Sequence, residues 1–530
     1  MKAPPPAVPV VSWTGFYVSG GFGYAMWAAD TRTIDPATGA CVLCVEQTQG
    51  GKGWLGTVGI GYDYQFTNRI VGGVFADFDF SNIKGTIQDQ GPFFAGRIKE
   101  SRAWSVGPRA GWLFTPQTLG YVSAGYTRAH FSSANMVDTF TGTPTPFFTP
   151  AFDKGGWFVG TGTETTFSWF GPGWFWRTEY RYSYFGIKTL TDSTPGAGPG
   201  VAVPGIGFFA NPQNSITFKP IVQAVRTELV YKFNWAGASR GAAWSEPTAI
   251  APVRWSGVYV NGGIGYGLWA ADTTTINPAT GVCVLCVRQT QGGKGWLGTV
   301  GIGYDHQFTE RIVGGLFLDA DLSSIKGTIQ DQIPFFAGKT KETWSWAVGP
   351  RVGWLWNPQT LSYVNAGYTQ THFDSASMVN TFTGVATGFA TPAFDMSGWF
   401  IGGGLERSLT MFGLFGPGWF WRSEYRYASY GTKTLTDSAP GAGPIVVVPG
   451  PGGGRFRTRK IQSPSSPRCR PFAPSWSTSS TGRADALRLT RLESPGPPPG
   501  AFCAKLRQWR RPESGYHRGG LGSARRLPGL

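Results

Sequence analysis

The chain has 530 residues and contains 78 glycines, 39 prolines and 15% aromatic residues, but only 14% charged residues. This composition differs from that of an average soluble helical or α/β protein. No apolar run approaches the ~20 residues that a membrane-spanning helix needs. The glycines recur in "GIGY", "VGG" and "GYT" within alternating segments, and nucleotide-binding glycine motifs are missing. The composition therefore favours an all-β protein.

The net charge of +16 is concentrated at the end of the chain. Residues 451–530 contain 16 Lys and Arg against 3 Asp and Glu, whereas the preceding 450 residues contain 30 basic and 27 acidic residues. A nucleic-acid-binding function inferred from the net charge would rest on this segment alone. We therefore expect no nucleic-acid partner.

The dominant feature of the sequence is an internal repeat with a period of about 242 residues. The segment "SWTGFYVSGGFGYAMWAADTRTIDPATGACVLC" from Ser12 returns as "RWSGVYVNGGIGYGLWAADTTTINPATGVCVLC" from Arg254. The register holds through Asp395, the counterpart of Asp153. Because this period far exceeds the roughly 20–50 residues of solenoid repeats, each copy is expected to be a whole domain.

Each copy consists of alternating apolar and polar segments separated by turn signals, with short and long connections in turn. Strands of about ten residues with such connections are typical of outer-membrane barrels. We expect an all-β fold: a transmembrane antiparallel up-and-down β-barrel of about eight strands per copy, with two copies in tandem. The expected strands of the first copy are Gly15–Trp27, Trp54–Phe66, Ile70–Phe80, Arg102–Phe114, Leu119–Phe131, Trp157–Phe167, Trp174–Phe185 and Thr217–Trp235.

The segment "GPGWFWRTEYRY" shows how the expected strands divide their two faces. Successive side chains of a strand point to opposite sides, so charged residues share one face and aromatic residues the other. An eight-stranded barrel is just wide enough for side chains to fill. The charged face should therefore form an ion network inside a narrow lumen, with the aromatic face toward lipid. The expected network comprises Asp77, Asp79, Arg109, Arg177, Glu179, Arg181, Arg226 and Glu228 in the first copy, and Asp319, Asp321, Arg351, Arg422, Glu424 and Arg426 in the second.

The repeat stops near Gly450, before the second copy has reached its eighth strand. Residues 459–483, read two bases further on with suitable synonymous codons, give "QNPVTFKPQVQTVRTELVYKFNWA", which differs from Gln213–Ala236 at only four positions. We infer a frameshift near Gly450. The expected domains are a Pro-rich segment (1–12), the first barrel (13–235), a linker (236–254), the second barrel without its last strand (255–450), and a basic, disordered low-complexity tail (451–530).

With these strands placed, the sequence resembles the Omp25/Omp31-like outer-membrane proteins of alphaproteobacteria, within the OmpA-like barrel superfamily. The resemblance rests on "PPPAVPVVSWTGFYVSGGFGYAMW", "VRTELVYKFNW" and, in the second copy, "WSGVYVNGGIGYG". It implies an outer-membrane location and a surface-exposed, envelope-stabilising or weakly porin-like protein, without catalytic residues or cofactors. Outer-membrane lipid, lipopolysaccharide and the barrel-assembly machinery are the implied partners. Family members usually carry a signal peptide, and none precedes the barrel segment in this sequence.

Two repeated side-chain groups were weighed as sites. Cys41 and Cys44, repeated as Cys283 and Cys286, are expected to form loop disulfides rather than a zinc or redox site. His130 and His372 end the fifth strand of each copy, where His with Ser132 or Ser133 and Glu164 could serve a lipid-modifying hydrolase. We favour histidines at the barrel rim. No metal site is expected.

The expected function is that of an integral outer-membrane barrel, structural or porin-like, with a narrow charged lumen. One alternative merges both copies into a single channel of about 16 strands. A lipid-A-modifying barrel enzyme and a soluble β-sandwich adhesin are the others. The outward tryptophans Trp54, Trp104, Trp112, Trp174, Trp176 and Trp235 are expected to form interfacial girdles rather than sugar-stacking platforms.

The frameshift makes a prediction that the gene sequence tests. A single insertion or deletion near codons 450–455 should restore a closing strand similar to "VRTELVYKFNW". Sequencing this region of the gene checks it, and the hypothesis fails if no such single change recovers the strand.

Overall fold

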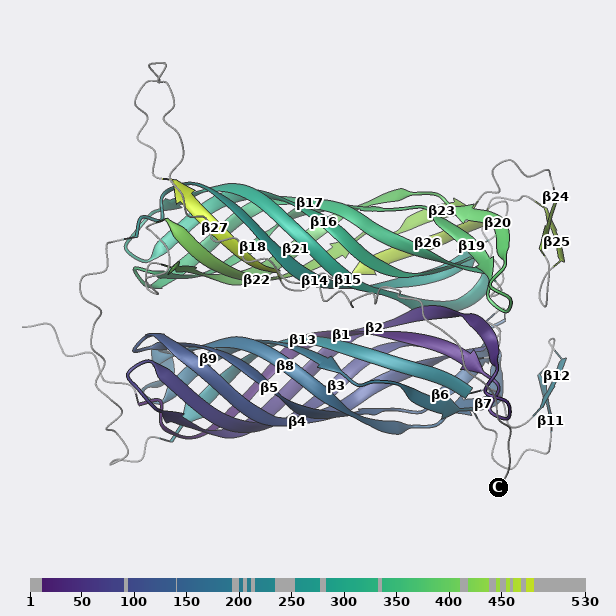
Figure 1. Ribbon diagram of the computed structural model, residues 1–530, viewed down its shortest axis with the longest axis horizontal. Helices are drawn as coiled ribbons and strands as arrows, with labels where there is room; N and C mark the ends of the chain where they lie inside the picture. Colours follow the sequence, from purple (N-terminus) through teal and green to yellow (C-terminus); the bar gives the residue numbers. More distant parts are fainter. Residues whose placement is uncertain are drawn as a thin grey trace, which may run out of the picture. The chain divides into compact units, whose positions relative to one another are not determined.

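The computed structural model describes residues 12–89, 94–139, 141–192, 200–203, 207–210, 215–233, 253–276, 283–331, 336–409, 418–437, 445–448, 454–457, 461–468 and 473–480. Antiparallel β-strands make up most of this part of the chain (Figure 1). Among these residues there is no helix of the length and apolarity needed to cross a membrane.

The first copy closes into a ring of eight long strands. Each strand pairs antiparallel with the next, and the last strand, β13, pairs with β1 through a register from Tyr17–Lys232 to Ile34–Ser215. Closure leaves no strand edge, so every backbone group can be satisfied inside a bilayer. The ring contains, in order, β1 (Gly15–Ile34), β2 (Cys41–Gln65), β3 (Ile70–Asp89), β4 (Phe94–Thr115), β5 (Thr118–Phe131), β8 (Phe152–Thr166), β9 (Trp174–Tyr184) and β13 (Ser215–Lys232).

The second copy repeats this order through seven strands. Two short strands, β26 (Ile461–Arg468) and β27 (Ala473–Ser480), then take the eighth position, pairing with β14 and β22. Tyr259 pairs with Ser479, as Tyr17 pairs with Lys232 in the first copy. The seven strands are β14 (Gly257–Ile276), β15 (Cys283–Gln307), β16 (Ile312–Asp331), β17 (Phe336–Asn357), β18 (Thr360–Phe373), β21 (Phe394–Ser408) and β22 (Trp419–Tyr430).

The pairing bears on two sequence-based expectations. The eighth position of the second ring is filled by residues from the expected tail, so strand structure continues beyond residue 450. The pairing of β1 with β13 closes the first ring at eight strands, whereas a merged barrel of about 16 strands would require β13 to pair elsewhere. Most of the expected Pro-rich segment and linker, and residues 481–530, lie outside the described part of the chain.

Shorter elements extend the connections at one end of each ring. In the first copy, β6 and β7 form a hairpin that continues the sheet from β4, and β10 pairs with β13. Their bounds are β6 (Ala134–Asp138), β7 (Pro144–Thr149), β10 (Lys188–Thr191), β11 (Gly200–Val203) and β12 (Gly207–Ala210), with a 3₁₀ turn η2 (Ser168–Phe170) at the opposite end. The second copy has β19 (Ala376–Asn380), β20 (Ala386–Thr391), β23 (Lys433–Asp437), β24 (Ile445–Val448) and β25 (Gly454–Arg457).

All eight strands expected in the first copy are present, but several are longer than predicted. The clearest case is the segment 28–53, which was expected to be a long connection. It continues β1 and β2 as a hairpin closed by a turn at residues 35–40. These extensions lie at the end of the ring that carries the long connections.

The outer surface between the strand ends is an apolar band bordered by aromatic pairs. On β2, Trp54 and Tyr62 are eight residues apart, about 26 Å along the strand, which spans about 20 Å of the ~25 Å apolar band at the ~40° strand tilt of outer-membrane barrels. Val58 and Ile60 between them are exposed. Pairs at the long-connection end include Tyr24–Trp54 and Trp104–Tyr126, and pairs at the short-turn end include Phe16–Tyr62 and Trp174–Tyr231. Trp235 lies outside the described residues.

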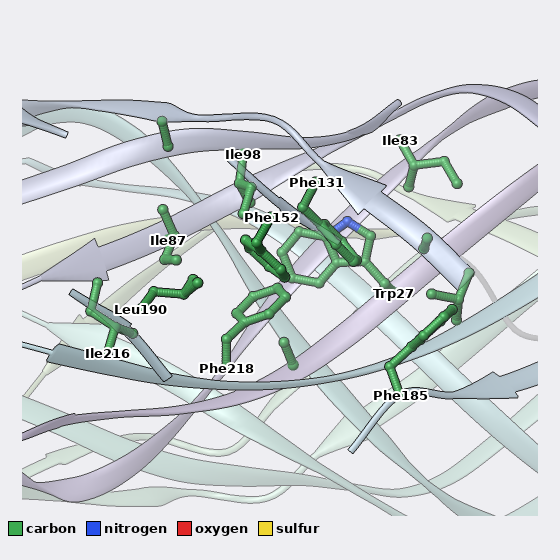
Figure 2. Close-up of a cluster of buried hydrophobic side chains, with 14 of the residues drawn as sticks. Trp27, Ile83, Ile87, Ile98, Phe131, Phe152, Phe185, Leu190, Ile216 and Phe218 are labelled. Carbon is green, nitrogen blue, oxygen red and sulfur yellow. The ribbon is translucent and has the colours of Figure 1, made fainter. Parts of the chain in front are cut away.

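The interior at the long-connection end of the first ring is filled by apolar side chains. Figure 2 shows Trp27, Phe131, Phe152 and Phe218 meeting inside the ring, where Phe131 stacks on Phe152 at 5.0 Å between ring centroids. Gly51 and Gly85 face the indole of Trp27, and a side chain at either position would collide with it. Gly51 of the "QGGKG" segment and Gly85 of β3 together leave a groove for Trp27, and Gly293 and Gly327 do the same for Trp269 in the second copy.

Candidate functional site

Inward-facing charged side chains occupy the membrane-spanning part of the first ring. Alternation along β9 turns Arg177, Glu179 and Arg181 inward, where their exposed fractions are 6%, 5% and 2%. Trp176 before them and Thr178 and Tyr180 between them face outward. The division of faces is the one that the sequence pattern predicts.

One group of charges lies toward the short-turn end of the ring. Arg109 donates to both oxygens of Asp63 and, at 3.1 Å, to Glu164. Arg177 reaches Glu164 at 2.8 Å and Glu228 at 3.2 Å. Glu164 thereby receives two guanidinium groups from two different strands, which links β4, β8 and β9.

Lys232 completes this group from the closing strand. Its ammonium lies 2.7 Å from Asp63 and 3.0 Å from Glu164, and the side chain is fully buried. Tyr17 from β1 lies between Arg109 and Arg177, and the centroid of its ring is 4.7 Å from the guanidinium carbon of Arg109 and 4.8 Å from that of Arg177. Both strands that close the ring, β1 and β13, therefore contact the same charge cluster.

A second group lies nearer the middle of the barrel. Arg181 donates to both oxygens of Asp77, at 2.9 and 2.6 Å, and to Glu179 at 2.9 Å. Arg226 from β13 binds Asp79 and lies 3.4 Å from Asp77. Each arginine thus lies beside two carboxylates, and the group joins β3, β9 and β13.

The space left between these groups is small. A cavity of about 10 Å³, lined by residues that include Tyr17, Asp77, Arg109 and Arg181, has room for at most a single water molecule. The Phe158 ring covers Arg181 at 4.4 Å from its guanidinium carbon. Side chains therefore fill the lumen at this level.

In the second copy, most of the ion pairs formed by residues of the first seven strands recur. Arg351 binds Asp305 and Glu406, and Arg422 reaches Glu406 at 2.9 Å. Arg426 lies 2.6 Å from both Asp319 and Glu424. Asp321 accepts a hydrogen bond from Ser345 at 3.0 Å.

The closing strand marks the difference between the copies. Arg226, Glu228 and Lys232 belong to β13, and the side chains of β26 and β27, which take its position, lie outside the described part. The charges that β13 supplies to the first interior therefore have no counterpart among the described side chains of the second.

The set expected from the sequence lacks Lys232 of β13, three further members in the first copy, and Asp305 and Glu406 in the second. Asp63, Glu164 and Tyr17 each stand between outward-facing residues of their strands, so strict alternation would have placed them inward. Glu164 had been weighed only as a partner of His130. The structure separates the two, because Glu164 pairs across the strands with Leu119 while His130 pairs with Asp153, eleven residues away along β8.

The remaining candidate residues lie outside the network. Cys41 and Cys44 form a disulfide with a Cα–Cα distance of 5.1 Å. Cys283 is also disulfide-bonded, and the side chain of Cys286 falls outside the described part. His130 contacts Asp153 at 2.8 Å, and His372 contacts Asp395 at 2.7 Å. In the described part of the chain, no three His, Cys, Asp or Glu side chains are grouped to hold a metal ion.

Comparison with known proteins identifies the barrel of the first copy. Residues 2–202 match the family described as outer membrane protein beta-barrel domain. The 31 kDa outer-membrane immunogenic proteins of Brucella melitensis biotype 1 and Brucella suis biovar 1 are each 28% identical over 200 residues, which cover 36% of this chain and 78% of the relative. The resemblance inferred from the sequence is thus confirmed for this part of the chain, and so is the outer-membrane location.

Solved structures give weaker similarities. Neisserial surface protein A aligns over 42% of this chain and 98% of its own, at 16% identity and a TM-score of 0.21. A FadL homologue of Pseudomonas aeruginosa aligns over 88% of this chain and 90% of its own, at 9% identity and a TM-score of 0.26. The fold assignment rests on the strand pairing and not on these alignments.

Loss of the Lys232 charge should destabilise the first barrel. In Lys232→Met, Asp63 and Glu164 remain buried with one cation fewer, and breaking a buried ion pair in this way costs about 3–5 kcal/mol. Urea titration of the full chain in detergent micelles, followed by hydrogen exchange of peptides from β9 and β13, measures the change. Lys219→Met on the outer face of the same strand is the matched control and should change stability by less than about 1 kcal/mol. Equal midpoints for the two variants would contradict a role of Lys232 in closing the barrel.

Proposed function

Because residues 2–202 carry an outer-membrane β-barrel domain, we propose that this outer-membrane protein is a structural component of the envelope whose lumens are closed to large solutes. The main support is the charge network, in which Arg109, Arg177, Arg181 and Lys232 pair with carboxylates across the barrel. Inward charges paired in this way leave no continuous water path. They act as an ionic core, not as an ion filter.

The apolar cluster around Trp27 supports the same proposal from the other end of the lumen. It fills the interior where the strands extend toward the long connections. A solute that entered from this end would meet packed aromatic rings before it reached the charges. The apolar cluster and the charge network thus fill successive parts of the lumen.

The long connections are the parts that we propose to be surface-exposed. In outer-membrane barrels the short turns face the periplasm and the longer loops face outward. The first ring has short turns at residues 66–69 and 116–117, while the β6–β7 hairpin lies at the other end. Exposure of such loops accords with the description of the Brucella relatives as immunogenic. Insertion with this orientation would make the barrel-assembly machinery a partner.

We infer no catalytic role for His130 or His372. His130 contacts Asp153 on the neighbouring strand, and His372 contacts Asp395 in the same way and also lies 3.9 Å from Asp374. Ser132 directs its hydroxyl to the carbonyl of Ser133, and Glu164 is bound within the ion network. The groups that a hydrolase would need are therefore not assembled around either histidine.

Conductance tests the closed lumen. The full chain in planar bilayers is expected to show no long-lived large conductance step, whereas a barrel of about 16 strands would open an aqueous channel. The variant Glu164→Ala/Arg177→Ala removes one anion and one cation from the lumen and should raise the conductance. His130→Ala/His372→Ala is the control and should leave it unchanged.

Heat-modifiable mobility on gels confirms that each of these variants has folded. A stable, porin-sized conductance of the unmodified chain would refute the closed lumen. So would an unchanged conductance in folded Glu164→Ala/Arg177→Ala, because the two side chains would then not be what blocks the path.

A further inference from the structure

A row of basic side chains lies on the outer surface of the first barrel, directly beyond the aromatic border of its apolar band. On β4 the outward positions change from Trp104 and Val106 to Arg102, and on β5 from Tyr126 to Arg128 and His130. Trp104 and Tyr126 pack at 5.4 Å between ring centroids. The charges therefore begin where the lipid-facing surface ends, at the end of the barrel with the long connections.

The register brings the two arginines together. Arg102 pairs with His130 and Trp104 with Arg128, so Arg102 and Arg128 are diagonal neighbours on adjacent strands. Diagonal neighbours on one face lie about 7–8 Å apart, within reach of long side chains. Both are exposed, so their guanidinium groups can meet above the aromatic border.

Asp153 fixes one of these arginines. It lies 3.3 Å from Arg128 and 2.8 Å from His130, and it is the carboxylate that β8 contributes to this surface. Further cations follow on the same face, where Lys84 pairs in register with Lys99. Within the described part of the chain, neither of these lysines nor Arg102 forms an ion pair with a carboxylate. The surface thus carries an excess of uncompensated positive charge.

Lipid headgroups are what this surface meets in a membrane. Clusters of Lys and Arg at the border of a membrane-spanning segment attract anionic lipid headgroups. The planar guanidinium fork matches the oxygens of a phosphate and binds it with two parallel hydrogen bonds. On the side of the long connections the headgroups are those of the outer leaflet.

We propose that the first barrel binds the phosphate groups of lipopolysaccharide lipid A through Arg102 and Arg128, with Asp153 and His130 positioning Arg128. The proposal rests on the outer-membrane placement under the proposed function, but not on the closed lumen. Lys84 and Lys99 extend the site away from the apolar band, toward further anionic groups of the headgroup.

The second copy contains the same surface with its central cations replaced. Trp344 stands in place of Arg102 and Gln370 in place of Arg128, while Asp374 replaces Ser132. Trp344 stacks on His372 at 5.3 Å, and Gln370 accepts a hydrogen bond from Trp346 at 3.2 Å. The histidine–aspartate pair remains, but the two guanidinium groups are absent. We therefore assign phosphate binding to the first copy alone.

The two copies supply reciprocal variants for the test. The full chain is incubated in mild detergent with bisphosphorylated lipid A, and the retained lipid is counted by native mass spectrometry over a titration. Arg102→Trp/Arg128→Gln gives the first copy the residues of the second and should weaken retention about tenfold or more. Trp344→Arg/Gln370→Arg should add a second retained lipid A.

Controls separate this site from other sources of binding. Arg69→Gln/Arg311→Gln removes two arginines at the short-turn ends and should leave retention unchanged. Dephosphorylated lipid A should be retained weakly by all variants, and millimolar inorganic phosphate should not displace the bisphosphorylated form. Heat-modifiable mobility again verifies folding.

Three results would overturn the proposal. The first is equal retention by the unmodified chain and folded Arg102→Trp/Arg128→Gln. The second is equal retention of the phosphorylated and dephosphorylated lipids, which would assign binding to the acyl chains. The third is displacement by inorganic phosphate, which would indicate a site for the free ion. Conductance measurements on the same variants should stay unchanged, so failure here is distinguishable from failure of the closed lumen.

Discussion

Each long strand crosses the hydrocarbon of the membrane and then projects into water, so the polarity of its inward side chains must change at the membrane border. Along β13 the inward positions are first all apolar, at Ile216, Phe218, Pro220, Val222 and Ala224, and then mostly charged, at Arg226, Glu228, Val230 and Lys232. In water an apolar core inside a polar surface drives folding. In hydrocarbon that driving force is missing, because the surroundings are as apolar as the interior. The ring therefore encloses an apolar core where it projects into water, and paired charges packed among a smaller set of apolar side chains where it crosses lipid.

An ionic interior specifies the register of the membrane-spanning part. A slip of one residue moves every inward side chain to the outer face. For β9 such a slip would move Arg177, Glu179 and Arg181 from paired positions into lipid. Buried ion pairs add little net stability, because desolvation offsets most of the attraction, but a broken pair is strongly destabilising. The network thus excludes alternative strand pairings. It also holds the ends of the ring together, because Lys232 of the last strand binds Asp63 on β2 and Glu164 on β8.

The membrane-spanning half of each strand could be predicted from the sequence because its alternation is strong. "WFWRTEYRY" places aromatic and charged residues on opposite faces, and the structure places them so. The extensions of β1 and β2 beyond Trp27 could not be predicted in the same way. Their polar outer face and the glycines of "QGGKG" on β2 resemble a loop, although the apolar residues of the extensions face inward. Gly51 lies within a strand, where any larger residue would collide with the indole of Trp27. The partners within the network depend on the pairing of distant strands, so the sequence identified many of its members but not their contacts. Asp63, Glu164 and Tyr17 were overlooked.

The change of sidedness along β13 is tested most directly by labelling two outward positions of that strand. A fluorophore is attached to Val225→Cys or Thr217→Cys in a full chain whose six native cysteines are replaced by serine, and the protein is placed in vesicles. Brominated lipid should quench the label at 225, while iodide in the water should quench the label at 217. Quenching of position 225 by iodide, or of both positions by brominated lipid, would contradict the account.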